Sequence, residues 1–351
     1  MDGLGERATA LERRVMPEEG LDQLVRALAR RGPVYGPVRQ DGATVYGEVE
    51  GAQDLDLRCT PFTYSPKALL HRPRQVLFRA ERAEGFVPRE PEEDGRMSII
   101  GVRPCDMSAI AALDQVFSQE YPDPYYQRRR QNALLAAVNC VEMAEHCFCT
   151  SMGTGPGLAA GFDLLLTRLE HGWLVEAGTE EGCAVLKEVE SRTATDRDLQ
   201  EKEELIRKAA AGAKKQLQTE GLPGLMRDRF EDPVWKERRE ECLGCANCTS
   251  VCPTCFCYDA YDVVNVKGDK VERTRCWTGC PVVDFARVHG GNFRSDRGER
   301  FKQFAYHKLC YWKDQFDRLG CVGCGRCMTW CPAKIDIAET AQSFRRGGEA
   351  R

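Results

Sequence analysis

The stretch CVGCGRCMTWCP, residues 321–332, places four cysteines within eleven residues and a proline directly after the last one. The stretch CLGCANCTSVCP, residues 242–253, repeats the same spacing, C-x2-C-x2-C-x3-C-P, earlier in the chain. This is the spacing with which bacterial ferredoxins hold [4Fe–4S] clusters through cysteine thiolates. Three cysteines wrap a short loop around one side of a cluster, and the fourth lies on the segment that leads away. The two stretches therefore predict a C-terminal part built around two clusters.

The fourth cysteine of each run binds the cluster of the other run in proteins that carry two such runs. The pattern therefore predicts two sets of four iron ligands. The first set is Cys242, Cys245, Cys248 and Cys331, and the second set is Cys321, Cys324, Cys327 and Cys252. Small residues between these cysteines allow the backbone to approach a cluster closely, and they are Gly244, Ala246, Gly323 and Gly325.

Structural zinc sites are the main alternative for clustered cysteines. Zinc is usually held by two separated cysteine pairs rather than by triplets with a distal cysteine–proline, so the spacing favours iron–sulfur clusters. A metal-stabilised interaction module without redox function is a further alternative. A secreted disulfide scaffold is disfavoured, because such scaffolds are short, whereas this chain has 351 residues and 19 cysteines.

Charge and hydropathy exclude two other classes of protein. Net charge is −4 with acidic and basic residues well mixed, so the chain lacks the basic excess of nucleic-acid-binding proteins. The sequence has no apolar run of about 18 residues, which predicts the absence of a membrane span. Its beginning, MDGLGERATALERRV, lacks the apolar core of a secretory signal. We therefore expect a cytoplasmic protein.

The chain is predicted to have an α+β fold with two domains. Residues 1–230 are expected to form an α/β docking domain, and residues 231–351 a ferredoxin-like domain with a long insert between its cysteine runs. MSIIGV (97–102) predicts a buried strand, followed by a helix capped by Asp106 or Ser108. The other expected elements are a strand within 132–140, a hairpin over 161–178 and a helix over 183–218 that is broken at EGLPGL.

The insert between the cysteine runs is expected to form a loop-and-helix excursion beside the clusters. Its basic residues are predicted either to offset the negative charge of thiolate-bound clusters or to cover a solvated helix face; they are Arg294, Arg297, Arg300, Lys302 and Lys308. The insert also contains four cysteines whose role stays open, with packing beside a cluster as one interpretation: Cys255, Cys257, Cys276 and Cys280.

Three segments resemble the iron–sulfur electron-transfer proteins of multi-subunit reductases. They are IIGVRPCDMSAIAALDQVF (99–117), CVEMAEHCFCTSMGTGPGLAAGFDLLLT (140–167) and the stretch from Cys242 to Ile337. The family comprises the beta subunits of soluble NiFe sulfhydrogenases and the corresponding iron–sulfur subunits of anaerobic sulfite reductases. The resemblance implies a protein that accepts electrons from a flavin-containing, NAD(P)H-linked partner. It passes them to a catalytic partner, either a NiFe hydrogenase or a sulfite reductase.

Four further cysteines lie in the first two of these segments, namely Cys105, Cys140, Cys147 and Cys149. Each segment follows an apolar, strand-like run, so both groups are expected at the same edge of one sheet. The glycines at 153, 155 and 157 leave room for the backbone to close around an inorganic cofactor. Two interpretations stay open, a third iron–sulfur cluster or small buried packing residues.

A catalytic site of the chain's own is the remaining alternative, with a substrate reduced near Cys147 and Cys149. The glycine-rich GTGPG (153–157) does not complete a nucleotide-binding motif, so a flavin or nicotinamide site in this chain is disfavoured. Cys59, Cys183 and Cys310 are isolated and are expected to pack in the core. The sequence therefore favours electron transfer by two clusters, with the α/β part docking to partners.

Overall fold

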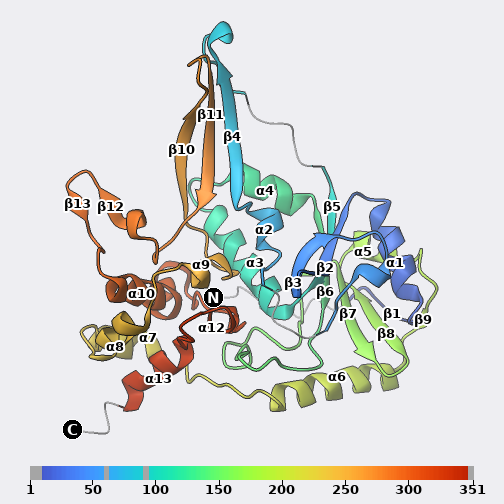
Figure 1. Ribbon diagram of the computed structural model, residues 1–351. Coiled ribbons are helices and arrows are strands. Elements are labelled where there is room, and N and C mark those ends of the chain that lie inside the picture. The colour runs from blue at the N-terminus through green and yellow to red at the C-terminus, as the bar shows by residue number, and fades with distance from the viewer. Residues whose placement is uncertain (1–9, 59–62, 90–94, 347–351) are drawn as a thin grey trace.

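An eight-stranded sheet forms the centre of the N-terminal part of the computed structural model, which describes residues 10–58, 63–89 and 95–346 (Figure 1). The strand order is β3-β2-β5-β6-β7-β8-β1-β9. The strands are β1 (Glu12–Met16), β2 (Val34–Gln40), β3 (Ala43–Glu48), β5 (Met97–Val102), β6 (Ala133–Val138), β7 (Leu164–Leu169), β8 (Gly172–Ala177) and β9 (Arg192–Thr193). The four neighbours β2, β5, β6 and β7 run parallel, and antiparallel strands extend the sheet on both sides.

Helices cover both faces of this sheet because its central strands are apolar on both sides. Every residue of β5 and β6 is buried, as is usual for parallel strands between two helical layers. Helices α1 (Gly20–Ala29) and α5 (Glu180–Leu186) pack on one face, and α3 (Pro104–Phe117) and α4 (Pro124–Gln131) on the other. The predicted α+β fold class, the strands at 97–102 and 132–140 and the hairpin at 161–178 are confirmed.

Two details of the predicted helices are wrong. Helix α3 begins at Pro104 after the extended residue Arg103, and Asp106 lies inside its first turn, where it forms an ion pair instead of a cap. The expected helix over 183–218 is divided between α5 and α6 (Asp196–Ala211), with β9 between them. The segment EGLPGL does not only break a helix, because α7 (Leu222–Asp228) begins within it and accommodates the proline in its first turn.

A second core lies under the C-terminal helices. These are α8 (Val234–Glu241), α9 (Asn247–Ser250), α10 (Arg297–Tyr306), α11 (Trp312–Phe316), α12 (Arg326–Thr329) and α13 (Ile337–Arg346). Aromatic side chains from α8, α10 and α13 meet there, including Trp235, Tyr306 and Phe344. Leu217 and Met226 also belong to this core, so packing crosses the expected boundary at residue 230, and the division into two domains stays a prediction.

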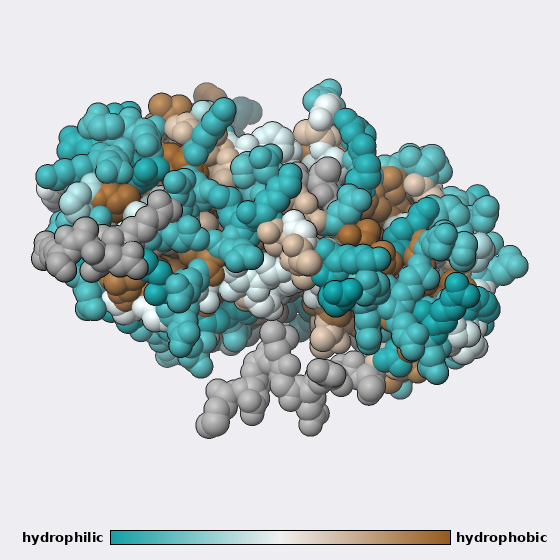
Figure 2. All heavy atoms as spheres, turned by 90° about the horizontal axis from the view of Figure 1, so that it is seen from below, coloured by the Kyte–Doolittle hydropathy of each residue, from teal (hydrophilic) through white to brown (hydrophobic). Residues whose placement is uncertain are grey.

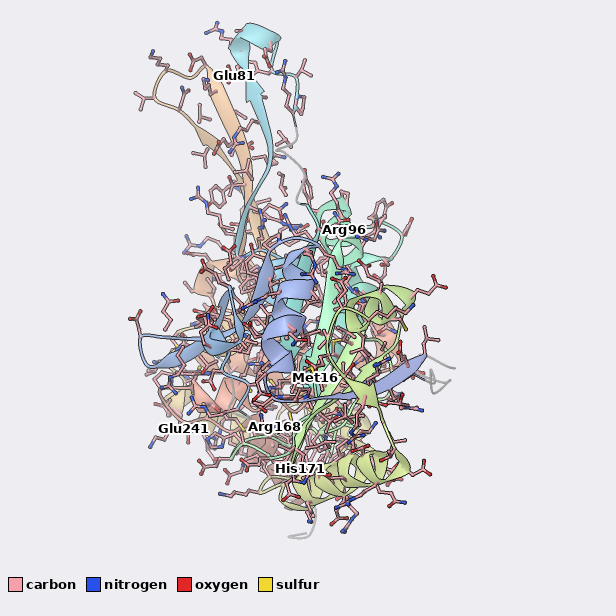
Figure 3. The ribbon with its side chains drawn as sticks, turned by 90° about the vertical axis from the view of Figure 1, so that its right-hand side faces the viewer. Met16, Glu81, Arg96, Arg168, His171 and Glu241 are labelled. Atoms are coloured by element: carbon pink, nitrogen blue, oxygen red, sulfur yellow. The ribbon has the colours of Figure 1, made fainter. Side chains whose placement is uncertain are left out.

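A three-stranded arm projects from the body of the molecule (Figure 1). It contains β10 (Tyr258–Val264) and β11 (Lys270–Trp277) from the insert, and β11 also pairs with β4 (Arg74–Glu81) from the N-terminal part. Figure 3 shows Glu81 near the outer end of the arm and His171 toward the opposite end of the molecule. The insert is therefore not the expected loop-and-helix excursion alone, because it begins with a β-hairpin.

The surface is mainly hydrophilic. Figure 2 shows polar residues over most of one face, with apolar residues in small separate groups. Within the described ranges, the helices are all too short or too polar to cross a membrane.

A buried ion pair joins the two parts of the chain. The Arg326 guanidinium at the start of α12 donates two hydrogen bonds to the Asp106 carboxylate in α3, each 2.7 Å long. Both side chains are almost fully removed from solvent, with exposures of 3% and 1%. A charge taken out of water at this depth requires its partner, since an uncompensated buried ion is costly.

We expect Asp106→Ala to lower the free energy of unfolding by about 3–5 kcal/mol, because the Arg326 guanidinium then stays buried without its carboxylate. Urea titration of the anaerobic protein measures this loss. Glu204→Ala, which removes the carboxylate of an exposed pair with Arg207, is the control and should leave the unfolding curve unchanged. A loss for Asp106→Ala as small as that of the control would contradict the assigned role of the pair.

Candidate iron–sulfur sites

The two cysteine runs form loops with the same backbone conformation. The residue two positions after the first cysteine is left-handed in both, with φ of 68° at Gly244 and 64° at Gly323. Its N–H group donates to the sulfur of that first cysteine, over 3.4 Å in each loop. Two positions further on, Ala246 and Gly325 are left-handed as well, with φ of 64° and 75°. This turn aims backbone N–H groups at the sulfur atoms, and such bonds are one control on the reduction potential of a cluster.

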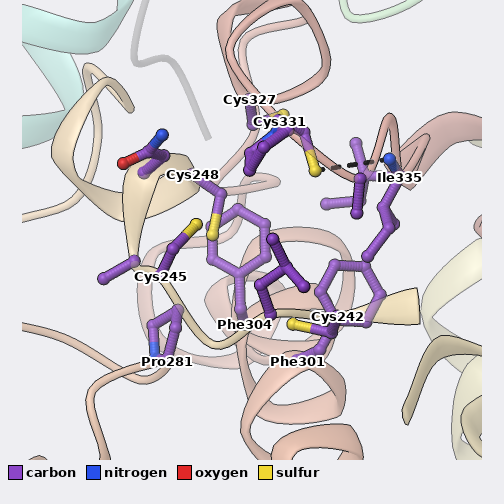
Figure 4. A pocket seen from close by; sticks show the side chains of 15 residues that line it. Cys242, Cys245, Cys248, Pro281, Phe301, Phe304, Cys327, Cys331 and Ile335 are labelled. Atoms are coloured by element: carbon purple, nitrogen blue, oxygen red, sulfur yellow. Dashed lines mark hydrogen bonds between the residues drawn. The ribbon is translucent and has the colours of Figure 1, made fainter. Parts of the chain in front are cut away.

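The four cysteines of the first set line one cavity, with about 520 Å³ of empty space (Figure 4). Figure 4 shows the sulfur atoms of Cys245, Cys248 and Cys331 directed toward this shared space. The remaining wall is apolar and includes Phe301 and Phe304 from α10. The Ile335 N–H donates to Cys331 Sγ over 3.3 Å. The distal cysteine of the second run is therefore brought to the first run, as the crossover pattern predicts.

The second set is more deeply buried. Burial raises the pKa of Cys321 to about 12 and that of Cys324 to about 11, and the neighbouring Cys252 thiol adds to both shifts. Burial, followed by the thiols of Cys321, Cys324 and Cys252, raises the pKa of Cys327 well above its usual value. The distal cysteine of the first run thus lies within electrostatic range of all three cysteines of the second run.

Cys252 differs from the other thiols of its set. A hydrogen bond from Cys255 lowers its pKa well below the usual value, against the effect of burial, and the ammonium groups of Lys308 and Lys67 act in the same direction. Both lysines are buried. The basic residues predicted to offset cluster charge include Lys308, whereas Lys67, in α2 (Lys67–Leu70), carries no recognisable signal in the sequence.

The four cysteines of the proposed third set also share a cavity, with about 460 Å³ of empty space. Cys105 follows β5 and Cys140 follows β6, and these strands are parallel neighbours, so both cysteines lie at the same edge of the sheet, as the sequence predicts. The loop after β6 adds Cys147 and Cys149 to the cavity wall. Burial raises the pKa of Cys149 to about 12 and that of Cys105 well above its usual value.

The third cavity shares a wall with the second set, because Cys324 and Arg326 line it too. The Phe148 N–H donates to the Gly323 carbonyl over 2.8 Å, and the Cys147 thiol approaches the Cys324 carbonyl at 3.6 Å. A Cβ atom at Gly323 would lie 2.7 Å from the Phe148 backbone, and one at Gly325 would lie 2.5 Å from the His146 carbonyl oxygen. Glycine is thus required here by close backbone contact as well as by φ.

The remaining cysteines fall into two groups. Cys257 and Cys280 lie within electrostatic range of Lys308 and of each other, beside the second set. Cys276 lies on β11 within 3.2 Å of the Tyr261 hydroxyl. Cys183 and Cys310 pack against the first and second cores, and Cys59 lies outside the described residues. The structure records every described cysteine as a free thiol.

The donor sets fit iron–sulfur clusters better than single ions. Across the described ranges, Cys, His, Asp and Glu side chains do not converge in groups of three that are able to hold one metal ion. The first and third sets instead surround a cavity, as required by a cofactor that is larger than an ion. Thiolates and backbone N–H groups directed at sulfur are the groups that hold such clusters.

Comparison with known proteins agrees with this geometry. Residues 241–335 match the family described as 4Fe-4S dicluster domain. The chain is 38% identical over 322 residues to sulfhydrogenase 2 subunit beta of Pyrococcus furiosus, and the match covers 90% of this chain and 93% of that protein. The search of solved structures returned no match. The chain therefore belongs to the family of sulfhydrogenase beta subunits.

Proposed function

We propose that the chain is the electron relay of a cytoplasmic multi-subunit hydrogenase, between a flavin-containing, NAD(P)H-linked partner and a NiFe catalytic partner. One observation carries the proposal: three groups of cysteines adjoin one another in a single chain, and Cys324 borders both the second and the third. The clusters that such thiolates hold supply one-electron redox chemistry. The similarity to a sulfhydrogenase beta chain favours a hydrogenase partner over a sulfite reductase partner.

The protein's part in this relay is to hold, shield and expose the right groups. Phe301 and Phe304 exclude water from the inner wall of the first cavity, whereas Cys245 is exposed at the surface. The first set is therefore the point at which a partner can approach closely. Free thiols throughout the described chain favour a reducing compartment, which supports the cytoplasmic location.

The proposed partners can be tested by purifying the tagged chain anaerobically from its own host. We expect a NiFe protein and a flavin-containing protein to co-purify with it. In the same complex, Cys324→Ser should abolish NAD(P)H-dependent hydrogen evolution but spare hydrogen evolution driven by reduced methyl viologen, because the viologen reaches the catalytic partner directly. A sirohaem-containing partner, or NAD(P)H-dependent activity that survives Cys324→Ser, would contradict the proposal.

The crossover ligation proposed for the two ferredoxin-type clusters predicts which variants share an effect. Cys252→Ser should perturb the same EPR signal as Cys321→Ser, and Cys242→Ser should perturb the other signal. Cys310→Ser is the control, since this buried thiol packs against Pro223 and belongs to none of the three sets. The assignment is wrong if Cys252→Ser and Cys242→Ser alter one signal that Cys321→Ser leaves intact.

A third iron–sulfur cluster at Cys105, Cys140, Cys147 and Cys149 extends the proposed relay toward the α/β part. It is supported by a cavity whose volume is close to that of the first, and by the meeting of two strand ends at one sheet edge. The wall it shares with the second set allows the two clusters to exchange electrons over a short distance.

We expect Cys149→Ser to lower the iron content by about four atoms per chain, from about twelve, because one of three cubanes loses a ligand. The EPR signals of the two ferredoxin-type clusters should persist. Cys183→Ser, at the edge of the first core, should leave the iron content unchanged. If both Cys149→Ser and Cys105→Ser retain the iron content of the unaltered chain, these four cysteines are packing residues.

A further inference from the structure

Two buried lysines lie beside the second set, and they come from opposite ends of the sequence. Lys67 begins α2, and Lys308 lies in a π-helical turn, His307–Tyr311, that continues α10. Such turns occur frequently at functional sites. The exposures of the two residues are 3% and 2%. Neither ammonium group is therefore solvated by bulk water, and each must be stabilised by groups of the protein or of a cofactor.

The ammonium contacts of both lysines lead to the segment that follows Cys252. Lys67 Nζ donates to the carbonyl oxygens of Cys252 and Cys255 over 3.0 and 2.9 Å, and lies 3.6 Å from the centroid of the Trp277 ring. Lys308 Nζ donates to Thr254 Oγ1 over 2.8 Å. Cys252 is a proposed cluster ligand, so both positive charges are held against one side of the second set.

Other buried cations of the molecule have carboxylate partners. Lys302, on the same helix as Lys308 and equally buried, lies 3.3 Å from Glu231 and 3.8 Å from Glu299. Within the described ranges, Lys67 and Lys308 have no carboxylate within ion-pair distance, and the anionic groups that act on Lys308 are thiols. A buried charge without an opposite charge is costly, so the pair requires an anion where the second set lies.

The first set has a different electrostatic environment. Its nearest buried cation is Arg300, whose guanidinium is held by the carbonyl oxygens of Pro281, Arg294 and Ser295. Neither Lys67 nor Lys308 lines the cavity of the first set. A change at either lysine should therefore act on the second set and spare the first.

We infer that Lys67 and Lys308 raise the reduction potential of the cluster held by Cys321, Cys324, Cys327 and Cys252. Reduction adds one electron and one unit of negative charge to that cluster, and two fixed positive charges at low dielectric stabilise the product more than the reactant. The electron comes from the reductant, dithionite in the test below, and no proton or bond changes at the lysines. The inference rests on the proposed function only in requiring a cluster at this set.

Lys308→Met and Lys67→Met each remove a charge and keep a side chain of similar length. The test is an anaerobic EPR titration with dithionite. We expect the second cluster to be reduced at a lower potential in both variants, with at least a tenfold fall in its reduced-to-oxidised ratio at the original midpoint. For a one-electron couple this corresponds to about 59 mV. The first cluster should keep its midpoint, and the control Lys302→Met should leave both midpoints unchanged.

Three outcomes would overturn the inference. The first is an unchanged second midpoint in both variants, and the second is an equal shift of both clusters. The third is the loss of the second signal in both variants while the first signal remains, because the lysines would then be needed for assembly and not for the potential. Failure of the proposed function is a separate result, since the unaltered chain would then lack two reducible cluster signals.

Discussion

The ion pair between Asp106 and Arg326 connects the chemistry of one part of the chain to the fold of the other. Asp106 follows Cys105 in the first turn of α3, and Arg326 lies between Cys324 and Cys327. Because both charges are buried and paired through two hydrogen bonds, α3 cannot move relative to the second cysteine run without exposing or separating them. The positions of the second and third sets are thereby fixed relative to each other.

Backbone contact reinforces this connection. The loop 146–149 lies directly against Gly323 and Gly325, where a side chain on either glycine would collide with it. The Thr154 hydroxyl, from the same loop, donates to the Val322 carbonyl over 2.7 Å. Strand β4 and Lys67 likewise reach from the N-terminal part to the insert. The α/β part thus contributes to the environment of the clusters in addition to any docking role.

Much of this arrangement follows from the sequence, because cluster ligation imposes strict local spacing. The two cysteine runs predict the first set, and the apolar runs before Cys105 and Cys140 predict that both lie at one sheet edge. Long-range pairing carries no such local signal. The hairpin of the insert takes its third strand, β4, from the distant N-terminal part, and its own sequence does not indicate that partner. Lys67 and Asp106 show the same limit. Asp106 has the sequence context of a helix cap, but an arginine far along the chain recruits its carboxylate. Lys67 is an ordinary surface residue by sequence, and it becomes buried only because Cys252 and Cys255 return to the N-terminal part.

Anomalous X-ray diffraction at the iron absorption edge, on anaerobically grown crystals, tests the central claim most directly, since it identifies the metal and locates it in one measurement. We expect three separate iron peaks. One lies among Cys242, Cys245, Cys248 and Cys331, one among Cys321, Cys324, Cys327 and Cys252, and one in the cavity lined by Cys105 and Cys149. Peaks at the zinc edge in place of iron, or iron coordinated by all four cysteines of a single run, would contradict it.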